Sequence, residues 1–371
     1  MKKYMMLHLA GLAVAGTLAS PAVAGSYTAS SWLPGTYELS SQGFVDTFDR
    51  VRENSGGELD FEVHLSGSLL PAKTTMTGVR DGVAQVGIVY PPYTPAELPF
   101  NNLLNSASFL SEDPMVAALA YTEMNFTNET LLAEWGRYGV VFGGGYSTPV
   151  YNLLCNNKIA AVGDMQGKRL RTASSTHSAI VSALEGSPVS APIGDVYSGM
   201  QRGSLDCAVA DPTNLVSASF NEVVTDVTDV PLGVVIGAIW VYNDDFWHDV
   251  TADDRRLLLD EMALGIIRTQ NLYRNNALSA LEDAKGRGIN IVEPEDDLTG
   301  FVKTYKADFI AGLSSTALEG SDAATSKALI DAYIATQARW ADLLKGIDRN
   351  DETALLAVIK ENLYDKVDVS K

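Results

Sequence analysis

The stretch GKRLRTASSTHSAIVSALEGSPVSAPIGDVYSGMQRGSLDCAVAD, residues 167–211, decides the fold class. Three short strand patterns, at 167–172, 188–191 and 205–210, alternate with two helix patterns. A β-α-β-α-β unit requires right-handed crossovers and parallel strands. Ligands of such sheets gather beyond the carboxyl ends of the strands. The residues that this rule selects are Arg171, Ser174, Ile193 and Asp211.

The rest of the chain repeats the alternation of strands and helices, which predicts an α/β fold with layered, mostly parallel sheets. We expect further strands at 59–63, 85–89, 140–142, 150–154 and 234–242, and helices at 36–54, 251–285, 295–313, 323–346 and 351–366. Gly143 to Gly145 is interpreted as a tight turn between two strands. The helix from Thr251 would be about 50 Å long, which is enough to bridge two lobes.

Length and charge limit the function classes. The 371 residues suit two domains of ordinary size. The net charge of −19 repels phosphate backbones and excludes nucleic-acid binding. The surface also disfavours docking on anionic lipid.

The N-terminus has the pattern of a secretory signal peptide. A basic start at Lys2 and Lys3 precedes an apolar run, and Ala22 and Ala24 provide the small residues before a cleavage point. The run is too short for a membrane-spanning helix. We therefore expect residues 1–24 to be removed and the mature protein to be exported to the periplasm.

Two cysteines, Cys155 and Cys207, are too far apart for a CxxC redox or zinc motif. In an exported chain such a pair favours a structural disulfide, and two buried thiols are the alternative.

The sequence lacks the residue motifs that are typical of an enzyme active site. The histidines of the mature chain, at 64, 177 and 248, lack metal-ligand spacing, and no nucleophile motif accompanies the glycines at 143–145. We expect no catalytic residue, no metal and no cofactor. A periplasmic α/β hydrolase or isomerase is the competing hypothesis.

Arg171 is the strongest candidate for ligand binding. It ends a parallel strand and is followed at once by a helix N-terminus, where free backbone N–H groups attract anions. Its planar guanidinium can hold a carboxylate through two parallel hydrogen bonds. An ordinary surface salt bridge is the alternative role.

Several motifs together resemble the periplasmic substrate-binding proteins of TRAP (tripartite ATP-independent periplasmic) transporters. They occur in that family's order and cover most of the mature chain through the long helix. The matching segments are 55–59 with 69–70, 78–84, 93–99, 163–171, 188–189, 195–197 and 201–206.

The resemblance implies a two-lobed periplasmic-binding-protein fold with hinge-crossing strands and a long bridging helix. We expect residues 25–149 and about 237–270 in lobe I, and 150–236 and about 271–371, with the C-terminal helices, in lobe II. The resemblance further implies that Arg171 grips a substrate carboxylate. Tyr151 falls where some members have a second basic residue, and Ser174 where some have a polar ligand contact.

The resemblance also implies partners. A small organic acid would be the ligand, and the membrane permease subunits of a TRAP transporter would receive it from a monomer or weak dimer. A sensor kinase or an ATP-driven importer is the alternative partner.

The residues predict a small monocarboxylate: a hydroxy, keto or aromatic acid. One guanidinium neutralises one carboxylate, and a second would be desolvated without a partner. Asp211, if it faces the cleft, would accept a hydrogen bond and repel a second carboxylate. The expected walls are aromatic, from Trp32, Tyr90, Tyr93 and Trp240. With Asp211 outside the cleft, a C4-dicarboxylate is possible; a zwitterion is a further alternative.

Overall fold

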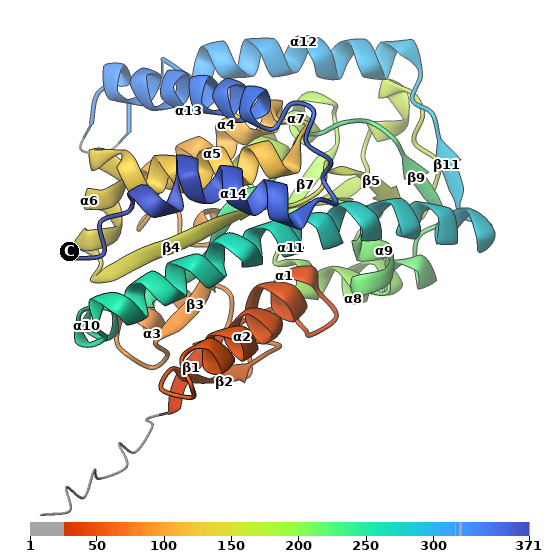
Figure 1. Ribbon diagram of the computed structural model, residues 1–371. Coiled ribbons are helices and arrows are strands. Elements are labelled where there is room, and N and C mark those ends of the chain that lie inside the picture. Colours follow the sequence, from red (N-terminus) through yellow and green to blue (C-terminus); the bar gives the residue numbers. More distant parts are fainter. Residues whose placement is uncertain (1–25, 316, 319–320, 371) are drawn as a thin grey trace, which may run out of the picture.

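The computed structural model describes residues 26–315, 317–318 and 321–370, and the predicted signal peptide lies outside these ranges. The chain forms two sheets with helices packed around them (Figure 1). The strand orders are β2-β1-β3-β10-β4 and β11-β9-β5-β8-β6-β7. None of the helices in the described ranges combines the length and apolarity that crossing a membrane would need.

The first sheet is mixed. Its strands are β1 (Ser26–Ser30), β2 (Asp60–His64), β3 (Val86–Val89), β4 (Val140–Ser147) and β10 (Ile236–Asn243). β1 is parallel to β2 and β3, whereas β10 is antiparallel to both of its neighbours, β3 and β4. Every residue of β3 and β10 is buried, as expected for central strands that are covered on both faces.

The three glycines of β4 correct one prediction. Gly143 to Gly145 lie inside the strand rather than in a turn. Aromatic rings press on the backbone here: a Cβ would lie 2.5 Å from the ring of Tyr242 at position 143 and 2.5 Å from that of Tyr121 at position 145. The glycines therefore provide room for rings, and they do not reverse the chain.

The second sheet contains the predicted parallel unit. Its strands are β5 (Asn152–Cys155), β6 (Arg169–Thr172), β7 (Ser187–Ser190), β8 (Cys207–Ala210), β9 (Asp226–Thr228) and β11 (Asn290–Val292). β6 lies between β7 and β8 and is parallel to both. The crossovers contain α7 (Ser175–Ala183) and α8 (Val196–Gln201), so the β-α-β-α-β prediction is confirmed.

Two segments of chain connect the sheets side by side. Residues 148–151 lead from β4 to β5, and residues 229–235 lead back from β9 to β10. The backbone N–H of Tyr151 donates to Gly233 (2.7 Å), and that of Leu232 donates to Tyr151 (2.9 Å). These paired segments are the predicted hinge-crossing strands.

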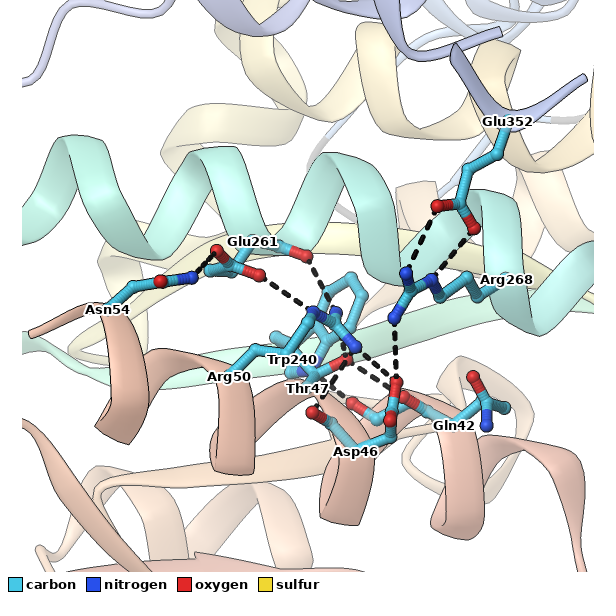
Figure 2. Close-up of polar contacts among 10 residues, drawn as sticks. Gln42, Asp46, Thr47, Arg50, Asn54, Trp240, Glu261, Arg268 and Glu352 are labelled. Carbon is cyan, nitrogen blue, oxygen red and sulfur yellow. Dashed lines mark hydrogen bonds and ion pairs between the residues drawn. The ribbon is translucent and has the colours of Figure 1, made fainter.

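The long helix α11 (Ala252–Gly286) contains 35 residues and begins at the predicted capping box of Thr251 and Asp254. It packs against β4 of the first sheet and β11 of the second, so it bridges both (Figure 1). Figure 2 shows how α2 (Thr47–Asn54) is fastened to it: Arg50 Nε lies 2.8 Å from Glu261 Oε2.

The remaining helices are α1 (Glu38–Ser40), α3 (Thr75–Arg80), α4 (Pro99–Ala107), α5 (Pro114–Thr127), α6 (Glu129–Arg137), α9 (Asn214–Ser217), α10 (Asp244–Asp249), α12 (Asp296–Leu313), α13 (Ala323–Leu343) and α14 (Glu352–Asn362). α13 packs on α4 and α5, where Trp340 Nε1 donates to Glu123 (2.7 Å). α5 in turn covers β4 of the first sheet, so α13 lies on the side of the first sheet. The prediction had instead grouped all of residues 271–371 with lobe II.

Candidate functional site

A cavity lies where the strand ends of the two sheets face each other across the hinge. The space not occupied by atoms, which includes some open solvent, is about 440 Å³. Aromatic side chains dominate its walls. The lining residues are Trp32, Leu33, Tyr37, Leu39, Tyr90, Tyr93, Tyr146, Thr148, Tyr151, Arg171, Ala173, Ile193, Asp211, Thr213, Asn214, Val235 and Tyr273.

Arg171 is held rigidly at the wall of this cavity. Its side chain is 1% exposed. Nε donates to the carbonyl of Ala191 (2.9 Å) and Nη1 to that of Val209 (3.2 Å), at the ends of the two neighbouring strands. Nη2 donates to the hydroxyl of Tyr93 (3.3 Å), which comes from the first lobe. These three hydrogen bonds fix the orientation of the guanidinium.

The charge of Arg171 has no carboxylate partner at ion-pair distance within the part of the chain that the structure describes. Desolvation acts to lower the pKa of Arg171, yet the neighbouring phenols, Tyr93 and Tyr151 foremost, leave that pKa above its ordinary value. The group is thus a fixed, buried cation surrounded by aromatic rings.

Asp211 is the other charged residue of the lining. It is 3% exposed, and its carboxylate accepts hydrogen bonds from the Thr213 backbone N–H (3.0 Å) and from Asn214 Nδ2 (2.9 Å). Burial raises the pKa of Asp211 to about 6. Within the described ranges, His, Cys, Asp and Glu do not form groups of three or more that could hold a metal ion.

The tyrosines of the cavity remain neutral phenols. Burial raises the pKa of Tyr37, Tyr90 and Tyr151 above the ordinary value. The Tyr37 hydroxyl lies 3.2 Å from Asn214 Oδ1, and the Tyr90 hydroxyl has no hydrogen-bond partner among the described residues. Phenols of this kind can donate to an anion without carrying a competing negative charge.

The structure brings together seven of the predicted site residues: Trp32, Tyr90, Tyr93, Tyr151, Arg171, Ile193 and Asp211. Ser174 is outside the lining. It is the N-cap of α7, and its hydroxyl lies 2.9 Å from Nδ1 of His177. Burial lowers the pKa of His177 to about 4, so this imidazole is neutral at pH 7. The predicted ligand contact of Ser174 is therefore replaced by a helix cap.

Trp240 was also expected in the wall, and this prediction is wrong. Its side chain is fully buried in the first lobe, and Nε1 donates to the carbonyl of Gly43 (2.8 Å). The ring packs so closely on α11 that a Cβ at Gly265 would lie 2.9 Å from it. Trp240 fixes the long helix to β10 instead.

Several residues that line the cavity were not predicted from the sequence. Tyr37 follows β1 in the same loop as Trp32, so an argument from strand ends could have found it. Asn214 follows Asp211 by three residues and begins α9, just beyond β8. Tyr146 lies in β4, which is almost entirely buried, and Tyr273 is one of the buried residues of α11; burial alone does not show which side chain faces a cavity.

The pattern of the family described as "Bacterial extracellular solute-binding protein, family 7" matches residues 38–308. The chain belongs to this family. Its members are solute-binding transport proteins, so the predicted family and the two-lobed α/β fold are confirmed.

Individual relatives have low sequence identity to this chain. The C4-dicarboxylate-binding periplasmic protein DctP of Shewanella loihica is 26% identical over 212 residues, which span 56% of this chain and 60% of the relative. A Bordetella pertussis solute receptor that binds pyroglutamic acid has a TM-score of 0.74 at 21% identity, covering 84% of this chain and all of its own. A marine metagenome TRAP protein specific for aromatic acid ligands has a TM-score of 0.76 at 17% identity, with 85% and 99% covered. The structural likenesses show the fold alone.

Proposed function

We propose that this protein captures a small organic monocarboxylate by closing its lobes and delivers it to a TRAP-type secondary transporter. The observation that carries the proposal is the buried, unpaired guanidinium of Arg171. A buried charge without a partner is strongly unfavourable, and a carboxylate ligand would supply the partner. The absence of such a partner among the described residues supports an anion as the natural occupant.

The donor count of Arg171 supports a carboxylate. A guanidinium has five N–H groups, and Ala191, Val209 and Tyr93 each accept from one. The Tyr151 phenol also interacts with the guanidinium, so a ligand carboxylate would take the terminal N–H groups that face the cavity in place of, or together with, this phenol. Two neighbouring donors match the two oxygens of a carboxylate.

The charges of the lining favour one carboxylate over two. Arg171 is the cation among the lining residues, and the carboxylate of Asp211 would repel a second anionic group. The tyrosines and Trp32 suit an apolar or aromatic body. Relatives that bind pyroglutamic acid or aromatic acids support this class, whereas the name of the Shewanella relative supports a C4-dicarboxylate as the second candidate.

The cellular role follows from the family and the N-terminus. Export through the signal peptide, with cleavage after Ala24, would place the mature protein in the periplasm. There it would bind its ligand as a monomer or weak dimer and present it to the membrane permease subunits. It would use no catalytic residue and no cofactor.

A thermal-shift screen of the mature protein tests the proposal. Lactate, a keto acid and a hydroxybenzoate form one set, and succinate, malate and fumarate the other. A ligand at about 100 times its Kd adds about 2.7 kcal/mol of stability. The first set should raise the melting temperature more, and a larger shift with the dicarboxylates would contradict the monocarboxylate assignment.

Two variants then locate the site. Arg171→Ala should abolish the shift, because the ligand carboxylate would be buried unpaired. Arg169→Ala is the matched control: Arg169 lies on the same strand but is exposed and pairs with Asp206 (2.8 Å). Equal ligand shifts in wild type and Arg171→Ala would overturn the proposal.

A further inference from the structure

The hydroxyl of Tyr90 is a buried polar group without a partner in the described part of the chain. The side chain is 3% exposed and lines the cavity. Its ring packs edge-on against Tyr93, with centroids 4.8 Å apart. A buried hydroxyl that makes no hydrogen bond is unfavourable, and such groups in native proteins need an explanation.

The position of Tyr90 is fixed by its surroundings. It is the first residue after β3 and precedes the turn Pro91–Tyr93. Asn102 Nδ2 anchors this turn by donating to the carbonyl of Pro91 (2.9 Å). The phenol therefore has little freedom to turn toward another partner, and its hydroxyl is available to whatever fills the cavity.

The electrostatic neighbours of the Tyr90 hydroxyl are the phenols of Tyr151, Tyr93 and Tyr146 and the guanidinium of Arg171. Tyr90 comes from the first lobe and Arg171 from the second. A ligand whose carboxylate pairs with Arg171 thus extends toward Tyr90 as the lobes close. A second oxygen close to that carboxylate would be within reach of the phenol O–H.

We propose that Tyr90 is the specificity-determining residue that recognises this second oxygen, so that the ligand is a 2-hydroxy, 2-oxo or lactam carboxylic acid. The inference rests on the proposed function and adds the chemical feature that selects one acid over another. The Tyr90 O–H donates to the ligand oxygen, and Arg171 holds the carboxylate. An acid without that oxygen leaves the hydroxyl unpaired and binds more weakly.

The test uses pairs of acids that differ by one oxygen: lactate against propionate, and mandelate against phenylacetate. Calorimetry on the wild-type mature protein should give about tenfold tighter binding of the oxygenated member of the better-bound pair. Tyr90→Phe should weaken that member about tenfold and leave the other within about twofold, which abolishes the discrimination. Tyr242→Phe is the matched control, because the Tyr242 hydroxyl is also buried and unpartnered within the described ranges but lies outside the cavity lining.

The other possible results distinguish failure of the Tyr90 assignment from failure of the proposed function. An equal loss for both members, or unchanged discrimination, overturns the role of Tyr90 while the proposed function stands. If the wild type binds none of the acids, the proposed function itself fails. Ligand-free Tyr90→Phe should melt at or above the wild-type temperature, since it lacks an unpaired buried hydroxyl. A lower melting temperature with equal affinity losses would make Tyr90 a structural residue and also overturn the assignment.

Discussion

The hydroxyl of Tyr37 lies 3.2 Å from Oδ1 of Asn214 and joins the two lobes at the edge of the cavity. Tyr37 precedes α1 of the first lobe, and Asn214 begins α9 of the second. A second bond runs in parallel, from the Thr36 hydroxyl to the carbonyl of Ser217 (2.9 Å). These bonds form only when the lobes approach, so they favour the closed, ligand-holding form.

Tyr37→Phe should therefore weaken ligand binding. The closed form loses one hydrogen bond of about 0.5–1.5 kcal/mol, which corresponds to a roughly two- to tenfold higher Kd. Calorimetry with the best ligand of the screen measures the change. Tyr27→Phe, on β1 and outside the cavity lining, is the control. An unchanged Kd in Tyr37→Phe would show that this bond does not contribute to closure.

Arg171→Lys tests the two-point grip on the ligand. The ammonium keeps the charge but presents no planar fork, and it cannot reproduce the bonds to both Ala191 and Val209. We expect a loss of about 2–4 kcal/mol in binding free energy, with the fold intact by circular dichroism. Arg169→Lys should leave the affinity unchanged. Wild-type affinity in Arg171→Lys would mean that charge alone suffices.

Much of the site could be predicted from the sequence because parallel strands bring their carboxyl ends to one edge. This rule selected Arg171, Ser174, Ile193 and Asp211, and all of these except Ser174 line the cavity. The fold followed from the same alternation, together with the capping box that begins the long helix.

For Trp240 the sequence does not indicate toward which face of the sheet the side chain points. All eight residues of β10 are buried, so alternation between polar and apolar positions is absent and cannot show which face a side chain occupies. The face is decided by Gly265 and Gly144, distant in sequence, which leave room for the indole next to α11. Tyr146 escaped prediction for the same reason, because nearly every residue of β4 is buried. Ser174 could serve as a helix cap or a ligand contact, and the local sequence favours both.

Cys155 and Cys207 form a disulfide between directly opposed residues of β5 and β8. The bond lies at the ends of these strands that face away from Tyr151 and Asp211, so it should stabilise the fold without affecting the ligand. Alkylation without reductant should add no mass to the intact protein. Replacing both cysteines with alanine should lower the free energy of unfolding by about 2–4 kcal/mol in guanidinium titrations. Two added alkyl groups would show free thiols instead.

Glu38 is buried beside the interface between the two lobes that Tyr37 and Asn214 join. Its side chain is 2% exposed; Oε1 accepts from Asn276 Nδ2 (2.8 Å), and Oε2 has no partner among the described residues. Burial raises the pKa of Glu38 from 4.5 to about 7. The folded protein therefore binds a proton here between pH 4.5 and 7 that the unfolded chain releases.

This pKa predicts that the Glu38 contribution to stability is complete below pH 4.5 and is lost as the pH rises through 7. Glu38→Gln keeps the hydrogen bond from Asn276 but cannot ionise. The difference in unfolding free energy between variant and wild type should therefore change by about 3 kcal/mol in favour of the variant from pH 4.5 to 8. Asp211, whose pKa is also raised, titrates in both proteins, and its charge contributes to the raised pKa of Glu38. Urea titrations across this range measure the difference, with Glu53→Gln on the exposed side of α2 as the control. A difference that does not vary with pH would place the Glu38 carboxylate in contact with solvent and contradict its burial.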